Sequence, residues 1–199
     1  MKTTKKLDRR TDRTRAALMT ALVDILLSEG YSAVTVERIA ERANVGRSTF
    51  YMHYNGKDDI LKASLTRPSS RLAALVGGDI AAQSLVPLLL HFHENRKRNR
   101  VFFGWETRDI WVRCLSGLIA SNLATTVHKH RDRPLIPVPM IARQIAEAQI
   151  ALVSNWLLAN TATKPDTIAE ALDAITQALL SSLLRGKPSG RSIGVQRSV

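Results

Sequence analysis

The stretch TVERIAERANVGRSTFYMHYNGK, residues 35 to 57, decides how the rest of the chain is interpreted. Apolar residues recur at helical spacing from Val36 to Ala43, and a short break follows at Asn44 to Gly46. Phe50 and Tyr54 then mark the buried side of a second short helix. The stretch therefore predicts two short helices that are joined by a tight turn.

The ends of these helices carry their own signals. Thr35 stands directly before the first apolar position, where its hydroxyl can accept a backbone N–H that has no partner inside the helix. Glu37 follows in a first turn whose dipole favours an acid. Asn44 tolerates the left-handed conformation that ends such a helix, and Gly46 frees the backbone to turn into the second.

The outward side of the second helix is rich in hydrogen-bond donors. The apolar side accounts for Val45, Phe50 and Tyr54, which leaves five donor side chains facing outward: Arg47, Ser48, Thr49, Tyr51 and His53. A helix that enters the major groove of DNA needs such donors for base edges and phosphates. A solvated polar face is the alternative, because pattern alone specifies a helix-turn-helix weakly.

The residues in and around the two helices favour a DNA-binding face over a solvated polar face. The run T-V-x-x-I-A-x-x-A-x-V-x-x-S-T-F-Y-x-H-Y-x-x-K-D-D-I-L, residues 35 to 61, resembles the DNA-binding domain of the tetracycline-repressor (TetR) family. The resemblance covers roughly residues 10 to 68. It implies that Arg47, Ser48 and Thr49 lie nearest the bases, with Arg47 able to bridge two guanine acceptors. It implies phosphate contacts from Thr35, Tyr51, His53 and Lys57.

Three residues depart from the family pattern. Asn44 stands where Gly is usual, and Gly46 stands where a Ser often caps the second helix. Both keep the backbone permissive. Met52 stands where a second aromatic residue is common, so one contact is lost and the preferred operator cannot be carried over from other members.

Composition predicts an all-α protein that works in the cytoplasm. The chain has 199 residues, 45% of them hydrophobic and only 5% aromatic, with few Gly and Pro. No strand-like alternation of convincing length appears, and no apolar run approaches the roughly 20 residues that span a bilayer. The single cysteine, Cys114, agrees with a reducing compartment and is expected to be a small buried residue.

The formal charge of +12 favours a polyanionic partner such as DNA. The excess is spread over the chain, because residues 1 to 70 hold 13 Lys and Arg against 8 Asp and Glu. Part of it lies in the basic run at 96 to 100, where solvated surface charge is the simpler explanation. RNA and anionic membrane surfaces attract the same charge and stay open as alternative partners.

Changes in composition and residues that interrupt helices divide the chain into four predicted parts. Residues 1–9 form a basic arm without periodicity, and residues 10–68 form the helix-turn-helix domain, with a first helix from about Thr11 to Glu29 that Gly30 ends. Residues 69–185 form a helical body, because Pro68 and the following serines interrupt the pattern. Helices are expected at 79–98, 104–131, 139–160 and 166–185. Residues 186–199 are expected to be a disordered basic tail.

The last two predicted helices are apolar on more than one face, so each must bury more than one face. One partner is the chain's own core, and a second copy of the chain is the other. The resemblance implies that these helices form a homodimer. The side chains expected at the dimer interface are Ile145, Leu152, Trp156, Leu172, Ile175 and Leu179.

Aromatic residues gather between the DNA-binding domain and these helices. Two interpretations stay open: core packing, and a cavity for a small-molecule effector with a few polar groups to orient it. The resemblance implies the second. The residues expected to bind such a ligand are Phe102, Trp105, Trp111 and Arg108.

No motif points to catalysis, a metal or a cofactor. His91 and His93 are two residues apart, which places them on different faces of a helix.

We therefore expect a homodimeric regulator with an N-terminal three-helix helix-turn-helix domain and a C-terminal helical ligand-binding and dimerisation domain. It is expected to be a repressor that an effector releases from a palindromic DNA operator. A DNA-binding protein of the same fold that has no effector, or that a partner controls, is the main alternative.

Overall fold

The computed structural model describes residues 2–78, 80–130, 133–159 and 161–185. Within these ranges the chain is almost entirely helical, which confirms the predicted fold class. Two strands of two residues each, β1 (Arg133–Pro134) and β2 (Leu184–Arg185), pair antiparallel. The tail predicted at 186–199 lies outside the described residues.

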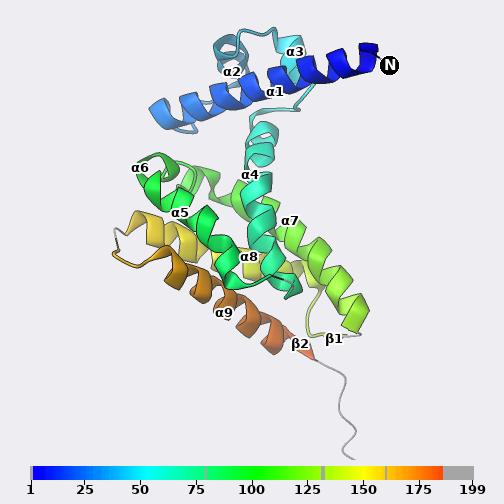
Figure 1. Ribbon diagram of the computed structural model, residues 1–199, viewed down its shortest axis with the longest axis vertical. Helices are drawn as coiled ribbons and strands as arrows, with labels where there is room; N and C mark the ends of the chain where they lie inside the picture. The colour runs from blue at the N-terminus through cyan, green and yellow to red at the C-terminus, as the bar shows by residue number, and fades with distance from the viewer. Residues whose placement is uncertain (1, 79, 131–132, 160, 186–199) are drawn as a thin grey trace, which may run out of the picture.

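The head of the molecule, which we define as α1 to α3, lies at one end (Figure 1). It consists of α1 (Lys2–Glu29), α2 (Val36–Arg42) and α3 (Arg47–Tyr51). Residues 2–9 of the basic arm, where the sequence shows no helical periodicity, belong to α1, which already begins at Lys2. Straight-chain basic residues lose little side-chain freedom in a helix, so they extend an existing helix without the cost of nucleation.

The rest of α1 follows the prediction. Its stripe of Leu18, Leu22, Ile25 and Leu26 is fully buried or nearly so. The chain leaves the helix at Gly30, which has a positive φ of 85° and donates its N–H to the Leu26 carbonyl at 3.1 Å. This is the left-handed cap expected of glycine.

Helix α4 (Lys57–Ala73) runs from the head into the body (Figure 1). The predicted interruption at Pro68 is wrong, because α4 continues through it to Ala73 and passes into the 3-10 helix η1 (Ala74–Gly77). Proline removes one helical hydrogen bond, but Leu61, Leu65 and Leu72 are buried on both sides of it. Tertiary packing therefore holds the helix together where its local propensity is poor.

The body, which we define as η2 to α9, follows the four predicted segments closely. The first segment is divided into η2 (Ala82–Leu85), α5 (Val86–Glu94) and α6 (Arg96–Asn99). It breaks at Asn95, whose side-chain amide donates to the His91 carbonyl at 3.0 Å. The other three segments are α7 (Trp105–His130), α8 (Val138–Leu158) and α9 (Pro165–Leu183).

Helix α7 is the central helix of the body and packs against α4 and α8. Its Leu115, Ile119 and Leu123 are fully buried. Cys114 is buried beside α4, with Sγ 3.9 Å from the Lys62 carbonyl oxygen, as the sequence predicted. By length and composition alone the segment Trp105–His128 is apolar enough to cross a bilayer, and 39% of its most apolar window is buried inside the protein.

Candidate nucleic-acid interface and ligand cavity

The predicted helix-turn-helix is present, with the caps that the sequence indicated. Thr35 accepts the backbone N–H of Arg38 at 3.3 Å. Asn44 has a positive φ of 53°, and the backbone is extended at Gly46 before α3 begins. The turn is closed by the N–H of Val45, which donates to the Ala40 carbonyl at 2.9 Å.

Aromatic packing sets the orientation of α3 on the head. Phe50 is fully buried, and Tyr54 is nearly so. The Phe50 ring meets Tyr51 edge-on with centroids 5.5 Å apart, and Tyr54 lies 5.9 Å away on the buried side. Because Phe50 faces inward, Ser48 and Tyr51 point to other faces of the helix and are exposed. Arg47, the first residue of α3, is exposed as well.

The donor-rich face of α3 is open to solvent. Tyr51 is 52% exposed and Met52 74% exposed, while Thr49 and His53 are half-buried. Figure 1 shows α3 at the end of the molecule remote from α9, so the body does not cover this face. The face is therefore available to a large partner.

The two other predicted phosphate contacts stand at the starts of neighbouring helices. Thr35 precedes α2 and is exposed. Lys57 opens α4, where its Nζ lies 4.6 Å from the centroid of the Tyr31 ring. An ammonium group above an aromatic face is weakly held and keeps its other side free for an anion.

Polar contacts fix the helices of the head to one another. The Tyr31 hydroxyl donates to the Asp58 carboxylate at the start of α4. Burial and this hydrogen bond raise the pKa of Tyr31 above its ordinary value. Arg38 of α2 pairs with Glu29 at the end of α1, and its Nη1 donates to the Ala33 carbonyl at 3.1 Å. The hydrogen-bonded Arg38 lowers the pKa of Glu29.

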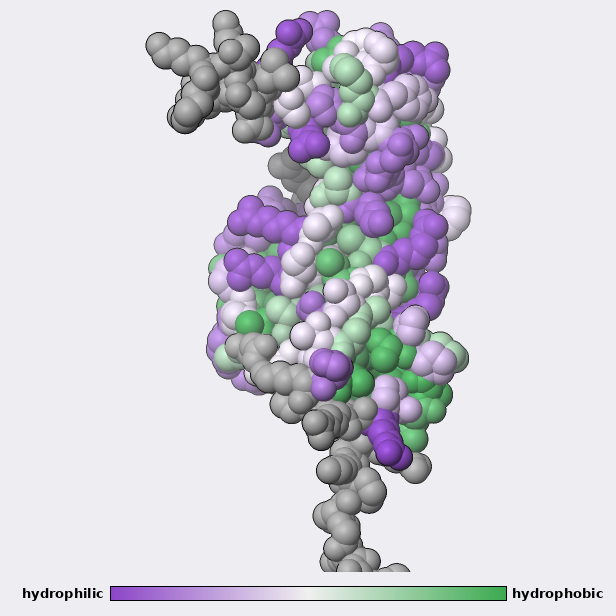
Figure 2. All heavy atoms as spheres, turned by 90° about the vertical axis from the view of Figure 1, so that its right-hand side faces the viewer, coloured by the Kyte–Doolittle hydropathy of each residue, from purple (hydrophilic) through white to green (hydrophobic). Residues whose placement is uncertain are grey.

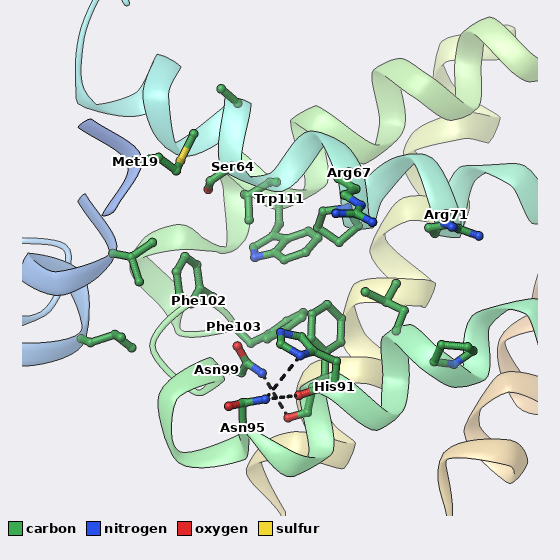
Figure 3. A pocket seen from close by; sticks show the side chains of 18 of the residues that line it. Met19, Ser64, Arg67, Arg71, His91, Asn95, Asn99, Phe102, Phe103 and Trp111 are labelled. Atoms are coloured by element: carbon green, nitrogen blue, oxygen red, sulfur yellow. Dashed lines mark hydrogen bonds between the residues drawn. The ribbon is translucent and has the colours of Figure 1, made fainter. Parts of the chain in front are cut away.

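A cavity of about 800 Å³ lies where head and body meet (Figure 3). Residues from α1, α4, α5, α6 and α7 surround it. Its lining is mainly apolar, and polar groups come from α4 and from the break between α5 and α6. The lining residues include Met19, Val23, Leu27, Ser64, Arg67, Arg71, Leu88, His91, Phe92, Asn95, Asn99, Phe102, Phe103 and Trp111. A volume of this size suits a small organic ligand.

Stacked rings form one wall of the cavity. Phe103 stacks on Trp111 with centroids 4.9 Å apart, and Phe92 meets Phe103 edge-on at 5.3 Å. Trp111 is almost fully buried, and its Nε1 has no hydrogen-bond partner among the described residues. A buried donor without an acceptor is unfavourable unless another molecule supplies one.

Only part of the predicted ligand site lies at this cavity. Phe102 and Trp111 line it. Trp105 does not, because it opens α7 and is 86% exposed. Arg108 points to α8 instead, where its Nη2 lies 2.6 Å from Oε2 of Glu147.

Sequence reasoning missed the contribution of α4 to the cavity. Arg67 and Arg71 are spaced by four residues, which places them on one face of a helix. That signal was hidden because Pro68 was interpreted as a helix end. His91 lines the cavity, whereas His93 stacks on Trp156 at 5.3 Å, which confirms that the two histidines face different ways.

The predicted dimer residues separate into two groups. Ile145 and Leu172 are fully buried and Trp156 nearly so within the single chain, so they have little or no surface to give to a partner, and this part of the prediction is wrong. Leu152, Ile175 and Leu179 are half-buried. Both helices carry apolar residues on more than one face, and packing of α8 against α7 and of α9 against α5 decided which side faces the core.

The chain is similar to known regulators, most clearly in its head. The family model described as "Bacterial regulatory proteins, tetR family" matches residues 18–64. The uncharacterized HTH-type transcriptional regulator YxbF of Bacillus subtilis is 36% identical over 69 residues, which are 34% of this chain and 18% of that protein. The chain therefore matches only about a fifth of the length of this relative.

Solved structures share the fold over nearly the whole chain. A TetR transcriptional regulator from Streptococcus agalactiae 2603V has a TM-score of 0.57 at 21% identity, covering 87% of this chain and 98% of that one. The Thermus thermophilus repressor FadR has a TM-score of 0.52 at 17% identity, covering 88% and 98%. Residues 18–64 therefore match the tetR family of bacterial regulatory proteins, and the fold that this family's solved members have extends over most of the chain.

Proposed function

We propose that the chain is a transcriptional regulator that binds double-stranded operator DNA as a homodimer and is released from it by a small-molecule effector. The observation that carries the proposal is the coincidence of the matched segment, residues 18–64, with an open donor-rich face on α3. The chain is expected to act in the cytoplasm.

On DNA, the N-terminal end of α3 would enter the major groove. Arg47, Ser48 and Thr49 would meet base edges there, and Arg47 can donate two hydrogen bonds to one guanine. Tyr51, His53, Thr35 and Lys57 would hold phosphates on either side. The phosphate contacts supply much of the affinity, and the base contacts supply the preference for one sequence.

Dimerisation would give this short helix a useful binding site. A helix of five residues touches few base pairs, whereas two copies about one helical turn apart read a palindrome. Apolar side chains that α8 and α9 leave partly exposed, Leu152, Ile175 and Leu179, suit an interface with a second copy. Figure 2 shows hydrophobic side chains gathering over the body rather than the head on the face in view.

The position of the cavity supports control by an effector. Met19, Val23 and Leu27 belong to α1 of the head, whereas Phe92 and Trp111 belong to the body. A ligand between the two parts can bind one arrangement of head and body better than another, and so shift the spacing of two α3 helices. Thermus thermophilus FadR has been crystallised in complex with lauroyl-CoA, so a protein of this fold accommodates a small molecule.

Selection of bound duplexes from a random pool, at one stated salt concentration, tests the DNA-binding proposal. The expected result is a palindrome whose half-sites are about one helical turn apart. Arg47→Ala should then lose selectivity at one position of each half-site. Binding without sequence preference, or equal binding to single-stranded RNA or anionic vesicles, would contradict the proposal.

A further inference from the structure

Two arginines face the cavity without a counter-charge. Arg67 and Arg71 lie one helical turn apart on α4, and both belong to the cavity lining. No hydrogen bond or ion pair joins either side chain to the part of the chain that the structure describes. The described lining contains no Asp or Glu. The cavity therefore has two positive charges that nothing in it neutralises.

Among the other polar groups of the cavity, the Trp111 N–H also requires an acceptor on the ligand, whereas Ser64, Asn95 and Asn99 each use a donor within the protein. Ser64 is occupied, because its hydroxyl donates to the Leu61 carbonyl at 2.6 Å. The side-chain amides of Asn95 and Asn99 donate to backbone carbonyls at 3.0 and 3.1 Å. The Trp111 N–H is buried and still without an acceptor among the described residues. Arginine and indole groups are donors only, so their partner must supply acceptors.

The apolar wall lies between these polar groups. In Figure 3 the side chains of Arg67 and Arg71 extend from α4 on one side of Trp111 and Phe103, and Asn95 and Asn99 lie on the other. Both arginine residues are exposed, so a ligand can place a charged group at them while its apolar body packs against the stacked rings. This arrangement requires an apolar body with a charged group at one end.

We propose that the cavity takes a small organic anion, with a flat aromatic or aliphatic body against Phe103 and Trp111 and a carboxylate at Arg67 and Arg71. The guanidinium groups can each give a carboxylate two parallel hydrogen bonds. An amine of the same shape is repelled by the uncompensated charge, and a neutral amide forgoes the charge-assisted bonds. The proposal names the class of effector for the proposed function and rests on it.

Calorimetric titration of the full chain with matched probes tests this inference. The probes are naphthoate, naphthamide and naphthylmethylamine, together with decanoate, decanamide and decylamine, at one fixed pH and salt concentration. The carboxylate of either series should bind at least about tenfold more tightly than its amide or amine, because its hydrogen bonds are charge-assisted. Each series keeps the apolar body constant, so the difference reports the charged group.

Variants locate the effect within the cavity. Arg67→Gln and Arg71→Gln, singly and together, should abolish the preference for the carboxylate while leaving amide binding intact, which also shows that the cavity is still folded. Lys62→Gln is the matched control, since it removes one exposed positive charge from α4 outside the cavity lining. An equal loss in Lys62→Gln would mean that general surface charge, not the cavity, selects the anion.

The outcomes separate the inference from the proposed function. Equal affinity for carboxylate, amide and amine, or no saturable binding of any probe, would overturn the inference. Equal affinities for the three probes would still agree with the proposed function, with a neutral molecule as the effector. If the carboxylate binds selectively but does not release the protein from the selected duplex, the cavity is an anion site but not the effector site.

Discussion

Arg47 at the start of α3 forms an ion pair with Glu37 of α2, with Nη2 2.7 Å from Oε1. Both side chains are more than half exposed, at 63% and 53%. An exposed pair of this kind contributes about 0–1 kcal/mol, whereas a bidentate contact to guanine is worth about 1–3 kcal/mol of discrimination. DNA should therefore draw Arg47 away from Glu37, and the pair positions the guanidinium without locking it.

The first prediction concerns that ion pair. Glu37→Gln should raise affinity for the selected operator by up to about fivefold, because Arg47 no longer has to leave an acid and one negative charge near the phosphates is gone. Fluorescence anisotropy with a labelled duplex measures this. Glu41→Gln removes another exposed acid of α2 and should have a smaller effect. Weaker binding by Glu37→Gln would show that Glu37 orients Arg47 for the contact.

The second prediction separates base contacts from phosphate contacts. Arg47→Ala should cost about 1–3 kcal/mol on the selected operator and little on a scrambled duplex. Lys57→Ala should weaken both duplexes alike and reduce the salt dependence by about one unit of slope. Titrations of both duplexes over a series of salt concentrations give the two quantities. A loss confined to the operator in Lys57→Ala would contradict its assignment to a phosphate.

The third prediction is a loss of stability at high pH. The pKa of Tyr31 is raised by burial and by its hydrogen bond to Asp58, and burial also raises that of Tyr54. The unfolded chain loses its phenolic protons near pH 10, whereas the folded chain keeps them, so the free energy of unfolding should fall as pH rises above about 10. Urea unfolding between neutral and strongly alkaline pH measures this.

A tyrosine variant tests which residue causes this decrease of the free energy of unfolding with pH. Tyr31→Phe removes one of the two groups and should make the alkaline decrease shallower, although the variant starts from a lower stability at neutral pH. Tyr51→Phe, on the exposed face of α3, is the matched control and should keep the slope of the unaltered chain. An unchanged slope in Tyr31→Phe would contradict the assignment.

The fourth prediction compares two glycines. Gly30 has a φ of +85°, a conformation that L-residues rarely adopt, and a Cβ there would meet nothing within 4 Å. Gly30→Ala should therefore destabilise the head by about 1–2 kcal/mol through backbone strain alone. Gly56 also has open space around it but an extended backbone, so Gly56→Ala should change stability little. Thermal unfolding distinguishes the two, and equal effects would exclude the strain argument.

The fifth prediction concerns the proposed dimer. Leu179→Glu, at a half-buried site on α9, should shift the chain towards a monomer in analytical ultracentrifugation while the helical circular dichroism is retained. Leu172→Ala should instead lower the free energy of unfolding by about 2–5 kcal/mol, because Leu172 is fully buried in the core. Glu170→Gln, at an exposed site of α9, is the surface control. A dimer unaffected by Leu179→Glu would place the interface elsewhere.

The sequence by itself determined the helix-turn-helix and the orientation of its donor face. The signals there are local: the Thr35 cap, the left-handed Asn44 and the spacing of Phe50 and Tyr54 all act within a few residues. Interactions between residues so close in the chain can be predicted from the local sequence. The same holds for Gly30, which ends α1.

The cavity and the roles of its residues were decided only by the tertiary structure. Helix α4 passes through Pro68 because buried leucines on both sides compensate for the lost hydrogen bond, and this continuation is what brings Arg67 and Arg71 to the cavity. In α8 and α9, apolar residues lie on more than one face, so the pattern could not say which of them meets the core. That choice depends on neighbours far away in the chain, since burial is a property of the assembled helices and not of any one of them.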